Sequence, residues 1–239
     1  RIEGNHCHKL RDGIYFEFVT ESEVVNNLSE HNFRYGLHFM FSNHDVYTDN
    51  TFQENGAGVA VMFSKFIHME RNLFKKNWGT ASYGLLLKEI YDAEIINNRF
   101  EENTIAINIE GSTRIHYTNN TLKGNGWAVK VAGACYKNVF EHNSFSSNAF
   151  DVSYNSKMND NLFNENYWGD YTGYDLDKDG IGDIPHRPVK LFSYIVNRTP
   201  ETIVLLRSLF VDIINFSEKV SPVFTPDDLV DEKPLMSLR

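Results

Sequence analysis

A short asparagine motif recurs along the first two thirds of the chain and constrains the fold more than any other feature. The motif reads N-x-[FL]-x-x-N, and six copies begin at Asn50, Asn72, Asn98, Asn120, Asn143 and Asn161. A weaker seventh copy begins at Asn26 and has His31 in place of the second asparagine. The steps between successive copies run from 18 to 26 residues. Near-copies at such a period indicate a solenoid, in which each copy contributes one turn of chain.

The segments between the motifs read as short strands. Apolar, β-branched and aromatic residues alternate with other residues at 58–63, 84–87, 105–109 and 127–131. That alternation and those lengths are typical of strands, and no helical period fits them. Leucine-rich and helical repeats need other patterns or longer segments. The chain is therefore predicted to be all-β, a right-handed parallel β-helix of about seven to eight coils of 22–26 residues each.

The composition changes after the repeats, and this divides the chain into three expected segments. The β-helix is predicted over 1–166, an acidic loop that closes the solenoid over 167–198, and a C-terminal helix with an extended tail over 199–239. Of 26 asparagines, 24 lie before residue 167, so the repeat ends there.

The motif itself has a structural explanation. A corner between two strands needs a left-handed backbone conformation, which asparagine tolerates. Its amide can bond to the equivalent amides of the coils above and below, as a ladder. The Phe or Leu two residues later is expected to point inward and stack on its counterparts. We therefore interpret both ladders as scaffold.

Charge and cysteine content exclude several classes of protein. The chain has 23 Lys and Arg against 32 Asp and Glu, a net charge of −9, which argues against a nucleic-acid-binding role. It has no apolar run of membrane-spanning length. Cys7 and Cys135 are expected about five coils apart, roughly 24 Å at one strand spacing per coil, which is too far for a disulfide.

The segment after the repeats contains the start of a calcium loop. Asp175, Asp177 and Asp179 alternate, Gly180 follows, and the next candidate ligands are the Ile181 backbone oxygen and the carboxylate of Asp183. Alternating carboxylates followed by a glycine suit a hard cation. Position twelve, usually a glutamate, is His186. The loop is either a weak structural calcium site or a polar turn whose carboxylates cap backbone amides.

A helix is expected to begin at Thr199-Pro200-Glu201, which combines a capping hydroxyl, an early proline and an early acid. The following residues 203–216 are apolar on most faces and too few to span a bilayer. Such a helix can cap the open end of the solenoid or offer a docking surface to another protein. The tail at 227–234 is expected to be extended and acidic.

Two sets of side chains could carry chemistry within the solenoid. Carboxylates are scattered, and only Glu70 and Glu94 could be neighbours, so an enzyme is not expected. A carbohydrate-binding or polysaccharide-cleaving β-helix protein remains the alternative. The stronger set is His38 and Met40, which share one strand face, with Met62 aligned on the next coil. Thioethers and imidazole suit copper, although methionines are also common core residues.

Three strings resemble the NosD family of periplasmic β-helix proteins involved in nitrous oxide reductase maturation. They are RYGLHFMFSN at 34–43, NYWGDYTGYDLDKDGIGDIPHRPV at 166–189 and LVDEKPLM at 229–236. The resemblance implies transient copper handling in the periplasm and no catalytic activity. It implies as partners an ABC permease and ATPase, a membrane-anchored copper chaperone and nitrous oxide reductase, with the helix at 200–219 contacting the permease. Family members carry a signal peptide and earlier coils, so the chain, which starts at Arg1, is expected to be a fragment.

Overall fold

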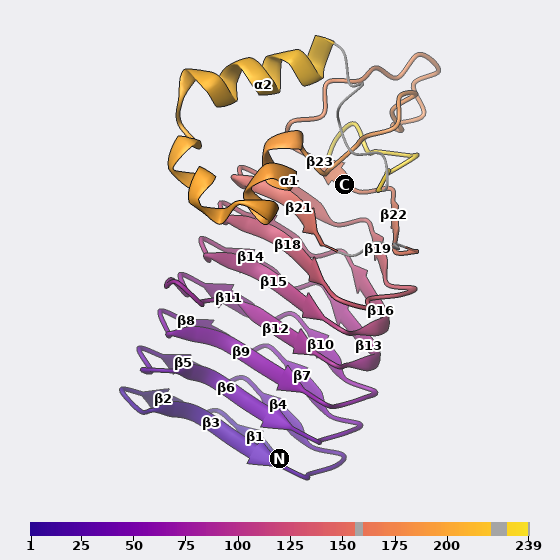
Figure 1. The fold of residues 1–239 in the computed structure, drawn as a ribbon. Coiled ribbons are helices and arrows are strands. Elements are labelled where there is room, and N and C mark those ends of the chain that lie inside the picture. Colours follow the sequence, from indigo (N-terminus) through magenta and orange to yellow (C-terminus); the bar gives the residue numbers. More distant parts are fainter. Residues whose placement is uncertain (156–159, 221–228, 239) are drawn as a thin grey trace.

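Three parallel β-sheets wind around a common core in the computed structural model, which describes residues 1–155, 160–220 and 229–238 (Figure 1). Each coil contributes one strand to each sheet, and the strands pair in register with those of the next coil. The predicted right-handed parallel β-helix is confirmed, with about seven turns and a small helical part at its C-terminal end.

We name the sheets A, B and C. Sheet A comprises β1 (Ile2–Glu3), β4 (Glu23–Val25), β7 (Val46–Thr48), β10 (His68–Glu70), β13 (Tyr91–Ile96), β16 (Thr113–Thr118), β19 (Val139–Glu141) and β22 (Leu162–Asn164). Sheet B comprises β2 (His6–His8), β5 (Leu28–Glu30), β8 (Thr51–Gln53), β11 (Leu73–Lys75), β14 (Arg99–Glu101), β17 (Thr121–Lys123), β20 (Ser144–Ser146) and β23 (Tyr167–Trp168). Sheet C comprises β3 (Asp12–Glu17), β6 (Tyr35–Met40), β9 (Ala57–Met62), β12 (Leu85–Lys88), β15 (Ile105–Glu110), β18 (Trp127–Ala132) and β21 (Phe150–Tyr154).

The motif aromatics fill the core as predicted. Phe52, Phe74 and Phe100 on sheet B are buried and stacked, with 5.6 and 4.5 Å between successive ring centroids. On the same sheet Phe145 stacks on Trp168 at 4.3 Å. Because parallel strands in register bring equivalent side chains one strand spacing apart, a repeated aromatic residue packs against its own copies.

The asparagine ladder exists, but its first members differ from the prediction. Asn27, not Asn26, donates from its backbone N and from Nδ2 to Oδ1 of Asn50. The ladder also extends one coil further back, because Asn5 donates to Asn27 in the same way.

The last expected copy of the motif is also shifted. Asn143 donates to Oδ1 of Asn166, 23 residues later, which makes Asn166 the ladder member and restores the regular step. Asn161 instead accepts from Asn138, at a different corner of the coil that leads into sheet A.

The left-handed backbone lies one residue before each ladder asparagine rather than at it. The residues with positive φ at this corner are Asn26, Asp49, Arg71, Asn97, Asn119, His142 and Glu165. The chain thus turns first, and the following asparagine points its amide inward, where it is buried. The turning position accepts several residue types, because its side chain projects outward.

This conformation allows a direct test at an exposed corner. Ser147 has a φ of 57° and lies outside the core. We expect Ser147→Val to destabilise the protein by about 1–2 kcal/mol, because a β-branched side chain fits the left-handed region poorly. Ser147→Gly should leave the stability unchanged or raise it slightly. Urea unfolding of both variants is the measurement, and equal midpoints would contradict the assigned geometry.

The helices begin earlier than predicted. α1 (Leu191–Arg198) lies within the segment expected to be a loop, and the expected helix start at Thr199 leads instead into the 3₁₀ helix η1 (Pro200–Leu205). α2 (Leu209–Val220) follows and lies above α1 in Figure 1. No helix in the described part of the chain is long and apolar enough to cross a membrane. The three-segment division of the chain stays a prediction.

α1 covers the open edge of sheet C. Phe192 and Val196 of this helix pack with Phe150 of the terminal strand β21, and the Ser193 hydroxyl donates to the Val152 carbonyl at 3.4 Å. Capping of the solenoid thus begins with α1, before the helix expected after residue 199, and Val211 of α2 is buried in the same apolar cluster.

The tail closes the other two sheets. Residues 229–236 return to the last coil, where Asp231 bridges to Phe163 and Leu235 bridges to Tyr167. The Asp231 side chain is fully buried and takes the place of the next asparagine. Its Oδ2 accepts hydrogen bonds from the Asn166 backbone N, from Asn166 Nδ2 and from Trp168 Nε1, at 3.0–3.1 Å. The described part of the tail expected to be extended and acidic, 229–234, therefore contributes to the last rung, and residues 227–228 of that prediction lie outside the described residues.

Both cysteines are free, as predicted. Cys7 lies on β2 in the first coil, whereas Cys135 is buried near the far end.

Candidate functional site

The predicted copper ligands lie on the outer face of sheet C. Along β6, Leu37 and Phe39 point into the core, so the alternating His38 and Met40 point outward. Met40 is the in-register partner of Met62 on β9. Both methionines are partly exposed and stand outside the main core cluster. Met62 also packs against a second, smaller apolar cluster that includes Ala60 and Leu86.

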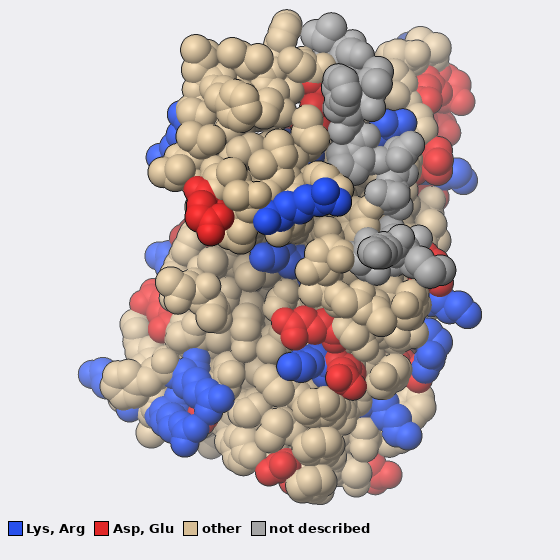
Figure 2. Space-filling view, in the orientation of Figure 1, with Lys and Arg blue, Asp and Glu red and all other residues tan. Residues whose placement is uncertain are grey.

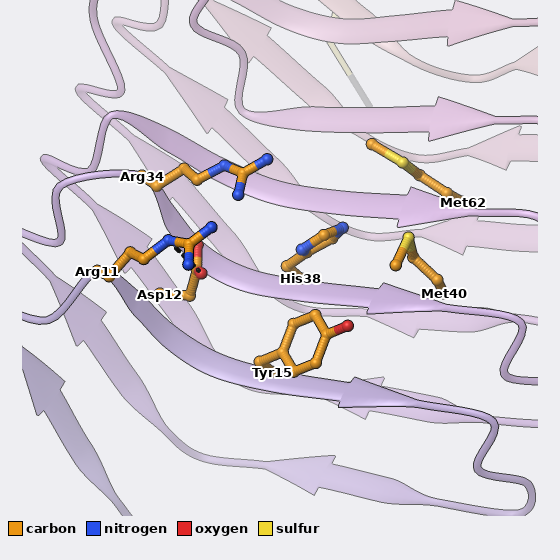
Figure 3. Close-up of a pocket in the computed structure, with 7 residues that line it drawn as sticks. All are labelled: Arg11, Asp12, Tyr15, Arg34, His38, Met40 and Met62. Carbon is orange, nitrogen blue, oxygen red and sulfur yellow. Dashed lines mark ion pairs between the residues drawn. The ribbon is translucent and has the colours of Figure 1, made fainter.

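These residues line a hollow of about 450 Å³ near the N-terminal end of the solenoid (Figure 3). Strand β3 supplies Tyr15, which pairs in register with His38. The complete lining is Arg11, Asp12, Tyr15, Arg34, His38, Met40 and Met62. Sheet C alone therefore brings one imidazole and two thioethers to one concave surface.

His38 is held in a form that can bind a metal. Its side chain is buried between the rings of Tyr15 and Tyr35, with centroids at 5.3 and 4.7 Å. Burial lowers the pKa of His38, so the imidazole is neutral at neutral pH. Its Nε2 is buried and has no hydrogen-bond partner among the described residues. A buried polar atom without a partner is costly unless something else binds it.

Charged groups stand at one side of the hollow. Arg11 Nε lies 3.6 Å from the Asp12 carboxylate, and one Asp12 oxygen is buried without a hydrogen bond within the described parts of the chain. The Arg34 guanidinium lies over the Tyr35 ring at 4.7 Å.

The acidic loop brings together three of its five predicted ligands. Carboxylate oxygens of Asp175, Asp177 and Asp179 all lie within 4.8 Å of one another. Asp183 stands outside this group and accepts a hydrogen bond from the Leu176 backbone N at 2.7 Å. Ile181 pairs with the tail through a bridge to Leu235.

The three carboxylates also cap backbone amides, which is the other role the sequence allowed. Asp175 accepts hydrogen bonds from the Lys178 and Gly180 backbone N atoms at 2.6 and 2.9 Å. Asp179 accepts one from the Ile181 backbone N at 2.7 Å. Because a carboxylate has further lone pairs, this capping leaves room for a cation.

Comparison with known proteins gives a family. Residues 1–173 match the family model described as "Periplasmic copper-binding protein (NosD)". The chain belongs to the NosD family. That description agrees with the periplasmic localisation expected from the sequence.

Two curated NosD relatives are both named "Probable ABC transporter binding protein NosD". The relative from Pseudomonas aeruginosa is 27% identical over 174 residues, which cover 66% of this chain and 41% of the relative. The relative from Stutzerimonas stutzeri is 27% identical over 219 residues, or 90% of this chain and 42% of the relative. The chain thus spans about two fifths of the length of these NosD proteins.

A solved structure shares the NosD fold. The A-module of the mannuronan C-5 epimerase AlgE4 from Azotobacter vinelandii superposes with a TM-score of 0.57 at 16% identity. The match covers 73% of this chain and 57% of the epimerase module. At this identity the likeness shows the fold alone, and it shows that the fold also occurs in enzymes.

The carboxylate pair considered for an enzyme is arranged differently in this NosD chain. Glu94 is the in-register partner of His68, whereas Glu70 pairs with Ile96. His68 Nδ1 lies 2.9 Å from Glu94, and its Nε2 lies 3.4 Å from Glu70. Both carboxylates therefore flank one imidazole on the outer face of sheet A.

Sequence reasoning missed the third strand that lines this hollow. DGIYFE of β3 lies in register with YGLHFM of β6, which places Tyr15 beside His38. Aligning these two hexapeptides by their shared glycine and apolar positions would have found Tyr15 and Asp12. Arg11 and Arg34 stand one residue before these hexapeptides, at equivalent positions of consecutive coils, and the Arg34 backbone N donates to the Arg11 carbonyl at 2.9 Å, so the same alignment would have found them too.

Proposed function

We propose that this chain is the copper-handling part of a periplasmic adaptor in an ABC transporter complex that assists copper insertion into nitrous oxide reductase. The family description and the names of the two relatives support copper binding and association with an ABC transporter. The observation that carries the proposal is the pair of aligned, outward-facing methionines next to a buried, neutral histidine.

The chemistry of these side chains suits transient handling of Cu(I). Thioether sulfur is a soft, neutral ligand, and neutral imidazole is a good partner for it. His38 sits on a rigid sheet and offers Nε2, whereas the two methionines are flexible and partly exposed. A rigid nitrogen with two adaptable sulfurs can accept copper from one protein and release it to another.

The proposed role is binding, not catalysis. In this role the solenoid docks a membrane-anchored copper chaperone and nitrous oxide reductase, while the transporter permease and ATPase form the complex around it. The names of the relatives, which describe binding proteins, support that reading.

We further propose that the helical extension contacts the permease. On α2, Leu209, Phe210, Ile213 and Phe216 are 74, 55, 55 and 68% exposed. Contiguous apolar side chains on a helix of this kind are typical of protein interaction sites.

Copper titration tests the proposed function. With Cu(I) supplied from a chelator, the wild-type chain should bind the metal in competition. Because thioethers do not titrate and burial lowers the pKa of His38, the affinity should be constant from about pH 8 down to the ordinary histidine value near 6.5. It should fall only at more acidic pH, as His38 becomes protonated. A chain that leaves all Cu(I) on the chelator at neutral pH contradicts the proposal.

We also propose that the acidic loop binds calcium weakly and in a structural role, through Asp175, Asp177 and Asp179 with further oxygens from Ile181 and Asp183. Weak sites of this type have dissociation constants of about 0.1–1 mM. Calcium at about 10 mM should then stabilise the folded chain by about 1–3 kcal/mol. Thermal unfolding with and without calcium measures this, and Asp177→Asn should abolish the effect. An equal shift in that variant would place calcium binding elsewhere.

A further inference from the structure

Two histidines stand side by side on the outer face of sheet B, in the first coil. Strand β2 reads His6-Cys7-His8, the single H-x-H sequence of the chain. Both imidazoles are exposed, whereas Cys7 between them packs against the core. The ring centroids of His6 and His8 lie 4.7 Å apart. Alternation along the strand thus brings two nitrogen ligands to one face.

A carboxylate from the next coil joins the two imidazoles. Glu30 on β5 is the in-register partner of His8, and its Oε1 lies 2.9 Å from His6 Nε2. Two donors that each lie about 2.0–2.1 Å from one metal ion are about 2.9–3.4 Å from each other, so this pair already has the spacing of metal ligands. The other Glu30 oxygen accepts a hydrogen bond from Gln53 Nε2 at 2.6 Å. Such an outer partner is typical of carboxylates that bind metals.

The fold does not require two histidines and a carboxylate at this place. In the following coils, the column that begins at His8 continues with Glu30, Gln53, Lys75, Glu101, Lys123 and Ser146. Further along this column a simple ion pair forms, in which Lys75 Nζ lies 3.2 Å from Glu101. One imidazole would be enough for such a pair with Glu30. Two imidazoles with one carboxylate form a ligand set found in zinc and iron sites.

One movement completes this ligand set. Among the described residues, the ligand atoms of His6, His8 and Glu30 do not all lie within 4.8 Å of one another, so His8 must turn toward Glu30 to share a metal ion. The two residues are direct neighbours in register, and the His8 side chain is exposed. Exposed side chains change rotamer readily, so the movement meets no packing barrier.

This ligand set is separate from the hollow on sheet C. Lys9 and Arg11 lie in the turn between β2 and β3, and Arg34 directly precedes β6. Figure 2 shows Lys and Arg side chains gathered at the left of the first coils, where the turns before β3 and β6 lie. These positive charges oppose a cation that would bridge the two places. The ligands also differ in kind, because nitrogen with carboxylate oxygen suits divalent ions and thioether sulfur suits Cu(I).

We propose that His6, His8 and Glu30 form a second metal site, which binds a divalent transition-metal ion and leaves its remaining positions to water. At a site of nitrogen and oxygen ligands the affinity follows the Irving–Williams order, so Cu(II) should bind more tightly than Zn(II). The inference goes beyond the proposed function, because this site uses none of the ligands assigned to Cu(I).

Titration of the full chain with Cu(II) and, separately, with Zn(II) tests the site. His6→Gln and His8→Gln each remove one ligand from an exposed position, so the fold should stay intact. His142→Gln is the matched control, because that exposed imidazole lies 3.7 Å from the Glu165 carboxylate at another corner. Asp177→Asn controls for divalent ions at the acidic loop. Electron paramagnetic resonance of the Cu(II) form counts the nitrogens bound to the metal.

The wild-type chain should bind Cu(II) with hyperfine splitting from two imidazole nitrogens. His6→Gln and His8→Gln should each weaken this binding by at least about 100-fold and abolish the two-nitrogen pattern, since losing a ligand costs more than losing an outer partner. Gln53→Ala should weaken it by about 10-fold. Both controls should behave as the wild type. Wild-type affinity in His8→Gln, or a wild-type spectrum without two nitrogens, would overturn the second site.

Measurements on the methionine variant separate this site from the proposed Cu(I) site. Met40→Leu/Met62→Leu should keep the Cu(II) affinity of the wild type, and His6→Gln/His8→Gln should keep its Cu(I) affinity. Loss of Cu(II) binding in the methionine variant would place the divalent ion in the hollow on sheet C and overturn the inference. A chain that holds Cu(II) through His6 and His8 but takes no Cu(I) would refute the proposed function and support the second site.

Discussion

Replacing both Met40 and Met62 by leucine should weaken Cu(I) binding by at least about 100-fold, because the metal loses both soft ligands and keeps only His38. Leucine has nearly the volume of methionine, and both side chains lie outside the main core, so the cost in stability should stay below about 1.5 kcal/mol. Competition against a Cu(I) chelator measures the affinity, and urea unfolding confirms that the fold is intact.

Two other methionines supply controls for this double variant. Met236 is 37% exposed on the tail, and Met69 is buried in the core of the solenoid. Met236→Leu and Met69→Leu should both leave the Cu(I) affinity unchanged. Wild-type affinity in the double variant would show that copper binds elsewhere on the chain, whatever the geometry of the aligned pair.

Asp231→Ala should destabilise the folded chain by about 3–5 kcal/mol, because it leaves several buried N–H donors without an acceptor, at about 1–3 kcal/mol each. Besides the bonds from Asn166 and Trp168, the carboxylate accepts hydrogen bonds from the Glu165 and Lys233 backbone N atoms, both at 3.1 Å. Alanine leaves these buried donors without acceptors, and each such donor is costly. The tail should then detach, and urea unfolding should begin at the C-terminal coils.

The neighbouring Glu232 provides the matched control, because it is exposed on the same segment. Glu232→Ala should change the stability by no more than about 0.5 kcal/mol. Asp231→Asn should fall between the two, since an amide keeps one acceptor oxygen but brings a donor group into a site surrounded by donors. If Asp231→Ala and Glu232→Ala have the same midpoint, the tail does not stabilise the solenoid.

The sequence was sufficient to predict the solenoid but not its register at either end. Each copy of the motif contains two asparagines five residues apart, and each of the two belongs to the ladder of a different corner. From the sequence alone, an asparagine can therefore be assigned to the wrong corner of the coil. Asn161 and Asn166 fit the spacing of the motif, yet they serve different corners. Only pairing between coils, which is a three-dimensional relation, separates them. Asn26 was misread because its neighbour Asn27 is the residue that turns inward.

The candidate site was predictable to the extent that it is periodic. His38, Met40 and Met62 follow from strand alternation and from the step between coils, and the structure places them on one outer face. Arg11 and Arg34 are periodic as well, since each stands one residue before the matching hexapeptides of β3 and β6, but the first coil carries no copy of the asparagine motif from which the repeat was read. The role of Asp231 could not be foreseen, because its partner Asn166 lies 65 residues earlier and the contact depends on the path of the intervening chain.

The substitution of aspartate for asparagine at the last rung has a consequence for assembly. Each ladder asparagine accepts from the asparagine of the coil before it and donates to Oδ1 of the asparagine of the coil after it, so the hydrogen bonds between these side chains all run in one direction. A carboxylate can accept the last of these bonds but has no amide hydrogen with which to continue the series. Exposed parallel edges invite end-to-end addition of further strands and, ultimately, fibres. Because the series ends on a carboxylate, the last rung offers no side-chain donor to a further coil at this corner. End-to-end growth of the solenoid is therefore opposed both by this missing donor and by the covering helix.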